Sequence, residues 1–218
     1  MISDILTCIL AVAAFVIGAL RFFRKGQPLY FMILICATGC FAVGLVANLV
    51  YALCNGFIQT TDFTISVFSY LGGGAFILTA NLGALDRSVY AKTSRKRAIL
   101  SLAAPVLYLV LVVLFAVVIM PADLLYGIVS VLFLLPNVVN AYCNFRHLLT
   151  PPDENGILSG IRGVDIFSLL FCILSVLCLL FYGLGNNTLP CDLTELGAAL
   201  ASFAIVISAI RGVKKWKI

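Results

Sequence analysis

The chain has 218 residues, of which 63% are hydrophobic and only 11% are charged. A water-soluble domain carries about 25% charged residues, so this composition excludes an ordinary soluble domain. The formal net charge of +5 comes from lysines and arginines that cluster between apolar segments, which is typical of a membrane topology signal and not of a nucleic-acid-binding surface.

Seven apolar segments are long enough to cross a hydrocarbon core of about 30 Å, which takes about 20 residues of α-helix. Only short connections separate these segments. The sequence therefore predicts an all-α integral membrane protein in which residues 1–218 form a single domain, a seven-transmembrane helix bundle. The expected spans are about 2–20, 29–54, 63–85, 99–120, 124–145, 164–184 and 194–212.

The basic residues predict the orientation of this bundle. All 14 lysines and arginines lie in the segments that follow spans one, three, five and seven. Because cytoplasmic loops collect Lys and Arg, we expect the N-terminus outside and the C-terminus in the cytoplasm, with the protein in the plasma or cytoplasmic membrane. The opposite side carries acidic residues only, namely Asp4, Asp62, Asp123, Asp192 and Glu195.

Short motifs at the outer ends of the spans repeat along the chain. Spans one and five begin with Asp4 and Asp123, spans three and seven begin with Asp62 and Asp192, and spans two and six end in Tyr-x-Leu-x-Asn. Both triplets start outside, so the pattern favours a parallel three-plus-one-plus-three repeat with span four as the linker. The alternative is that each Asp only caps its helix and complements the helix dipole.

Span five carries the most distinct polar face. At about 100° per residue, five polar side chains project within about 80° of arc along the whole span. Such a line can form the wall of a polar pathway or binding cavity, or it can hold neighbouring helices together through hydrogen bonds. The five residues are Tyr126, Ser130, Asn137, Asn140 and Asn144, and the helix-distorting Pro136 lies beside them.

Span three has a similar, softer polar face. Ser69, Tyr70 and Asn81 share one side of the predicted helix, and Gly72, Gly73 and Gly74 interrupt it near its middle. Three consecutive glycines permit either a close approach of another helix or a local bend. We expect the polar face of span three to lie opposite that of span five.

The eight cysteines do not form a disulfide framework. Those inside spans behave as small apolar side chains. Cys54 and Cys191 each lie at an outer end, after span two and before span seven. They form either a disulfide in an oxidising exterior or two unpaired thiols.

Two partial resemblances to known families stop at topology. The run Asp86-Arg87-Ser-Val-Tyr90 resembles the acidic-Arg-aromatic motif of G-protein-coupled receptors, but the Tyr is displaced and span seven has no Asn-Pro-x-x-Tyr. The size and the predicted repeat resemble sugar facilitators, which have a proline in the first helix of each triplet. Span one has no proline, so the sequence assigns the chain to no family.

The sequence shows no catalytic, metal or cofactor site. His147 is the only histidine, which excludes a multi-histidine metal centre, and we expect it to cap the C-terminal end of span five. The ionisable residues Asp86, Arg87 and Asp165 fall at cytoplasmic ends of spans. Transport driven by an ion through a buried carboxylate is therefore not expected.

These observations favour a non-enzymatic membrane protein that binds a small uncharged polar solute, or lets it pass, along the face of span five. Span three would contribute the opposite wall of the path. The alternative is a membrane subunit or sensor that acts through a partner protein, in which the almost purely apolar span four contacts that partner instead of lipid. Beyond the lipid bilayer, the sequence names no partner and no cofactor.

Overall fold

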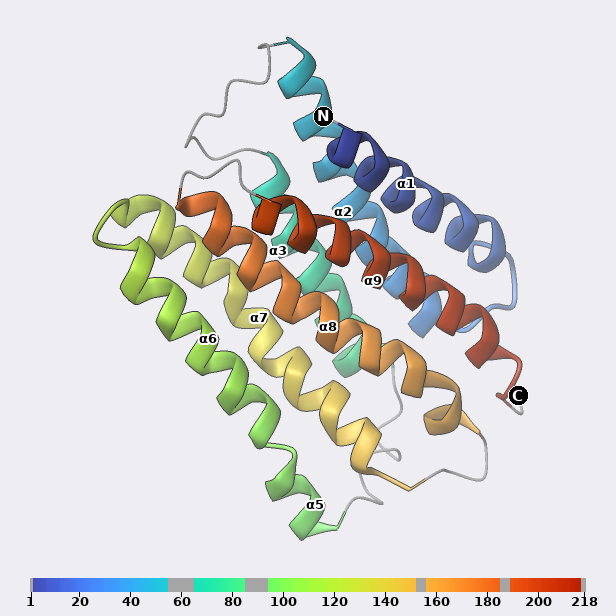
Figure 1. The fold of residues 1–218 in the computed structure, drawn as a ribbon. Coiled ribbons are helices and arrows are strands. Elements are labelled where there is room, and N and C mark those ends of the chain that lie inside the picture. The colour runs from blue at the N-terminus through green and yellow to red at the C-terminus, as the bar shows by residue number, and fades with distance from the viewer. Residues whose placement is uncertain (1, 55–64, 85–93, 152–155, 185–188, 217–218) are drawn as a thin grey trace.

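The computed structural model describes residues 2–54, 65–84, 94–151, 156–184 and 189–216, and every regular element in these ranges is a helix. The residues discussed above that lie outside the described part of the chain are Asn55, Asp62, Asp86, Arg87, Tyr90 and Asn186. The helices are α1 (Ile2–Phe22), α2 (Leu29–Cys54), α3 (Ile65–Thr79), the π-helix η1 (Ala80–Ala84), α5 (Arg95–Leu100), α6 (Ala103–Ile119), α7 (Leu124–Leu149), α8 (Ile157–Gly183) and α9 (Leu189–Val213) (Figure 1).

Among the described residues, six helical stretches are long and apolar enough to cross a membrane. The chain is therefore an integral, multi-pass membrane protein. One of the six combines α5 and α6, as Arg95–Ile119. The segment predicted as the third span is divided into α3, of 15 residues, and η1, of 5 residues, which follow each other directly.

Two rows of three helices form the bundle. In one row α2 packs between α1 and α3, and in the other α8 packs between α7 and α9. The rows meet along two seams, because α1 packs against α9 and α3 packs against α7. Helix α6 lies outside this ring and packs against α7 and α8 (Figure 1).

The facing ends of α7 and α8 extend further than their apolar residues predict. Helix α7 continues to Leu149 instead of ending near 145, and α8 begins at Ile157 instead of near 164. Gly156 precedes α8 with a left-handed φ of 73°, a conformation that glycine adopts without a steric cost. As a result Asp165 lies about two turns inside α8 and is buried. The sequence places Asp165 near the cytoplasmic end of span six, and hydropathy alone could not show that this residue is buried against a neighbouring helix.

The glycines of α3 serve close helix packing. A Cβ atom added to Gly74 would lie 2.6 Å from Oδ1 of Asn137 in α7, and one added to Gly72 would lie 3.2 Å from Sγ of Cys40 in α2. Small residues allow membrane helices to approach this closely. Of the two uses predicted for the triple glycine, the structure shows close approach on both sides of α3.

Cys54 and Cys191 are free thiols in the structure. Cys54 is exposed at the end of α2, whereas Cys191 is buried. The Cys191 thiol faces Cys178 of α8 and not α2. Its neighbour is therefore a second span of the same three-helix row.

Replacing Gly74 with Ala should destabilise the bundle, because the new methyl group collides with the Asn137 amide. We expect a loss of about 1–3 kcal/mol, the usual cost of overpacking, measured as a lower unfolding temperature in lipid nanodiscs. Gly83→Ala is the control, because its nearest neighbour would be Thr79 Cγ2 at 3.9 Å. Equal effects of the two substitutions would contradict the close α3–α7 approach.

Candidate functional site

All eight residues predicted to line a path are buried: Tyr126, Ser130, Asn137, Asn140 and Asn144 of α7, Ser69 and Tyr70 of α3, and Asn81 of η1. The α7 side chains lie in the interior because one face of this helix is turned to α3, η1 and α8. In contrast, the opposite face of α7 exposes apolar residues such as Leu132 and Val139. The polar periodicity of span five therefore marks its inward face.

Four of these residues form an amide cluster that joins α7 to α3 and η1. The Asn140 Nδ2 donates to the Gly74 carbonyl at 2.9 Å and to Asn137 Oδ1 at 3.1 Å. The Asn81 Nδ2 donates to Asn144 Oδ1 at 2.9 Å and lies 3.5 Å from Asn140 Oδ1. We use the name amide cluster for Asn81, Asn137, Asn140 and Asn144. Its hydrogen bonds cross the α3–α7 seam. The polar residues of span three were expected to lie opposite those of span five, and Asn81 of η1 lies opposite Asn144 of α7.

Local backbone features place the members of this cluster. Pro136 lies inside α7 without ending it, and because proline has no N–H, the carbonyl of Leu132 one turn earlier loses its helical partner. Asn81 belongs to η1, and π-helical turns are rare and occur often at functional sites. No feature of the sequence indicated this π-helix.

Tyr126 and Tyr70 bind α8 and do not join the amide cluster. The Tyr126 hydroxyl donates to the Leu179 carbonyl at 3.0 Å, and Gly183 leaves room for the ring, since a Cβ there would lie 2.7 Å from Tyr126 Cε1. The Tyr70 hydroxyl donates to Cys178 Sγ at 3.4 Å. These two hydrogen bonds therefore join α3 and α7 to α8 near the N-terminal ends of α3 and α7.

A buried histidine–aspartate pair continues the polar line of α7 toward its C-terminal end. Nδ1 of His147 lies 3.0 Å from Oδ1 of Asp165, and the two side chains are 1% and 0% exposed. His147 lies in the last turn of α7, as expected, and its ring is also turned into the bundle toward Asp165. His147 follows Asn140 and Asn144 at helical spacing, and this periodicity was the one signal in the sequence that could have revealed it.

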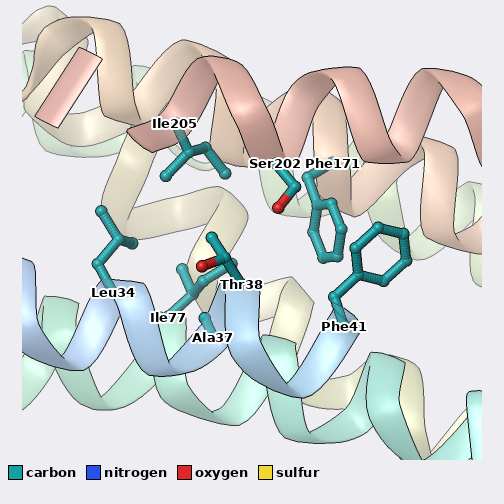
Figure 2. Close-up of a pocket in the computed structure, with 8 residues that line it drawn as sticks. All are labelled: Leu34, Ala37, Thr38, Phe41, Ile77, Phe171, Ser202 and Ile205. Atoms are coloured by element: carbon teal, nitrogen blue, oxygen red, sulfur yellow. The ribbon is translucent and has the colours of Figure 1, made fainter. Parts of the chain in front are cut away.

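The axis of the bundle offers no polar path. Figure 2 shows the small cavity there, whose volume of about 10 Å³ holds about one water molecule. Phe41 and Phe171 meet edge to face across it, with ring centroids 5.2 Å apart. The hydroxyl of Thr38 donates to Ile35 of its own helix. The other residues around the cavity are Leu34, Ala37, Ile77, Ser202 and Ile205.

The polar residues thus run beside the axis, as a polar column. We use this name for Tyr126 and Ser130, the amide cluster, His147 and Asp165. Nδ2 of Asn144 is buried and has no hydrogen-bond acceptor among the described residues. An unmet buried amide costs about 1–3 kcal/mol, so a small polar guest at this position would be stabilised.

The column carries donors and acceptors but offers no metal site. Within the described ranges, no group of three or more His, Cys, Asp or Glu side chains could hold a metal ion. Comparisons with known protein families, with curated proteins and with solved structures give no match. The function must therefore be argued from the column itself.

A double-mutant cycle should show that Asn81 and Asn144 stabilise the bundle through each other. We expect Asn81→Ala and Asn144→Ala to be coupled by about 0.5–2 kcal/mol in unfolding free energy. The control pair is Asn144→Ala with Thr79→Ala, because the Thr79 hydroxyl bonds only to Ala75 of its own helix. Strict additivity of the Asn81 and Asn144 substitutions would contradict the 2.9 Å hydrogen bond.

Proposed function

We propose that this protein is a seven-span facilitator that lets a small uncharged polar solute pass along the polar column. The observation that carries the proposal is the amide cluster, four buried asparagine side chains of which three belong to α7 and one to η1. Amides both donate and accept hydrogen bonds and carry no charge. They therefore suit a solute with hydroxyl or amide groups better than an ion.

In the structure the column is closed, and opening it would require α3 and η1 to part from α7. The hydrogen bonds that hold this seam are the ones from Asn140 to Gly74 and from Asn81 to Asn144 and Asn140. Interhelical hydrogen bonds of this type contribute about 0.6 kcal/mol each. Their sum is only a few times the thermal energy, so a solute that replaces them could open the seam.

The proposed topology places the N-terminus outside and the C-terminus in the cytoplasm. It takes α3 and η1 together as the third of seven spans, since residues 65–84 match the length needed to cross the hydrocarbon core. An odd number of crossings is supported by the two chain ends, which lie at opposite ends of the bundle (Figure 1). The distribution of Lys and Arg supports the direction.

The proposal includes the parallel duplication. The contact of α1 with α9 has a counterpart in the contact of α7 with α3. The contacts of α2 with α1 and α3 likewise have counterparts in those of α8 with α7 and α9. Such a pattern is the one expected when a twofold axis along the membrane normal relates the two rows.

A second candidate function, a subunit or sensor that works through a partner, is favoured by α6. This helix is apolar on every side, and Leu107 and Val117 are 68% and 67% exposed. A partner helix could cover this face in place of lipid.

Solute passage should depend on the amide cluster and not on the bundle axis. In proteoliposomes challenged with urea, glycerol or a small sugar, we expect permeation of at least one solute above that of protein-free vesicles. Asn137→Leu should lower this permeability about tenfold, which corresponds to about 1.4 kcal/mol. The control Thr38→Val removes a buried hydroxyl that lies outside the column and should leave permeability intact.

If Asn137→Leu lowers the unfolding temperature while permeability stays at the wild-type level, the cluster only holds the helices together. In that case the proposed path along α7 is wrong.

Fusions to alkaline phosphatase in a bacterial host should report the topology. We expect an active enzyme after Ala122, between α6 and α7, and an inactive one after Thr150, between α7 and α8. Activity after Thr150 would contradict the proposed orientation.

A further inference from the structure

The passage of an uncharged solute does not require the buried pair of His147 and Asp165. Oδ1 of Asp165 lies 3.0 Å from Nδ1 of His147, and Oδ2 of Asp165 is buried with no hydrogen-bond partner among the described residues. An ionisable group inside a membrane bundle is costly and marks a functional site. This pair lies at the end of the column nearest to the segment that joins α7 to α8.

Few charged groups act on the pair. On its own helix, Arg162 lies one turn before Asp165, interacts with its charge, and donates Nη2 to the Thr150 carbonyl at the end of α7 at 3.3 Å. Within their described bounds, α3, η1 and α6 carry no charged residue. Helix α5, which packs against α7, carries Arg95, Lys96 and Arg97, and all three are exposed. Among the described residues, Arg162 is the charged group besides His147 that acts on Asp165.

The two other helices that touch α8 contribute little charge at this end. In α7, Arg146 is turned to its own helix, where Nη1 donates to the Tyr142 hydroxyl at 3.3 Å. In α9, Arg211 is exposed, and the acidic residues Asp192 and Glu195 lie near the opposite, N-terminal end of the helix.

Adding a proton to this pair changes how α7 and α8 are held together. With the carboxylate ionised, the His147 ring donates a charge-assisted hydrogen bond to Asp165, which is roughly twice as strong as a neutral one. A proton on Asp165 removes this charge and also the attraction of Arg162. The attraction between the C-terminal end of α7 and the N-terminal end of α8 is then weaker.

We propose that the His147–Asp165 pair is a proton-binding site that controls the inner end of the polar column. His147 lies one turn from Asn144, the residue that accepts the hydrogen bond of Asn81. A shift of the last turns of α7 would therefore be passed directly to the seam that closes the column. The proton acts here as a regulator of the path and not as its driving force, and in this sense the inference rests on the proposed function.

The single histidine of the chain allows a direct test. With ¹⁵N-histidine as the only label, the full-length protein in nanodiscs gives ring signals from His147 alone. We expect these signals to change between neutral and mildly acidic pH, because a proton on Asp165 removes the charge-assisted hydrogen bond of the ring. In Asp165→Asn the change should be lost, because the carboxylate that binds the proton is gone.

Asp123→Asn is the matched control. Asp123 lies at the other end of α7, where its carboxylate caps the helix by accepting a hydrogen bond from the Tyr126 N–H. This substitution should leave the pH response of the His147 signals as it is in the wild type. Signals that stay constant across this pH range in the wild type would overturn the proposal without any variant. A pH response of the His147 signals that is the same in Asp165→Asn and in Asp123→Asn would overturn it as well.

Control of the column is measured separately, by hydrogen exchange of the α7 backbone after correction for the intrinsic pH dependence. The exchange is compared at neutral and at mildly acidic pH. In the wild type we expect the C-terminal half of α7 to exchange faster at the acidic pH. In His147→Gln and Asp165→Asn we expect fast exchange at both pH values. Exchange that is independent of pH in the wild type would overturn the inference. Solute permeation that does not change with pH would overturn the proton control but not the proposed facilitator. A pair that binds protons in a protein that passes no solute would overturn the facilitator but not the proton-binding site.

Discussion

The hydrogen bond from Asn140 to the carbonyl of Gly74 joins the two rows of helices. Hydrocarbon offers no partner for a buried polar group, so the amides inside the bundle bond to one another and to the backbone of a neighbouring helix. Gly74 makes this contact possible, since any side chain there would occupy the place of Asn137. The remaining members of the amide cluster complete the same seam.

This constraint separates the two regions of the interior. The axis of the bundle is filled by aromatic and aliphatic side chains around a cavity of about 10 Å³, and it holds the rows together by packing. The amide cluster and the His147–Asp165 pair lie at one side, between α3, η1, α7 and α8. A solute path beside the axis, closed by a few weak hydrogen bonds, is therefore compatible with a rigid centre.

The sequence predicted six long apolar helices and the inward face of α7 well, because apolar length and helical periodicity are local properties. It failed wherever a residue depends on a partner in another helix. In the sequence Asp165 is only a charged residue near the end of a span, and its pairing with His147 is visible only in the structure. Tyr70 shares a predicted helix face with Asn81 but donates its hydrogen bond to Cys178 of α8. The π-helix around Asn81 has no compositional signature, so hydropathy could not reveal it.

Native mass spectrometry of protein gently solubilised from its own membranes tests the central claim most directly, because it sees both bound solute and bound protein. A column that receives a small polar solute predicts a monomer or homo-oligomer with a small polar adduct, and loss of that adduct in Asn140→Leu. A stoichiometric second polypeptide without any adduct would contradict the claim and would make the chain a subunit of a larger complex.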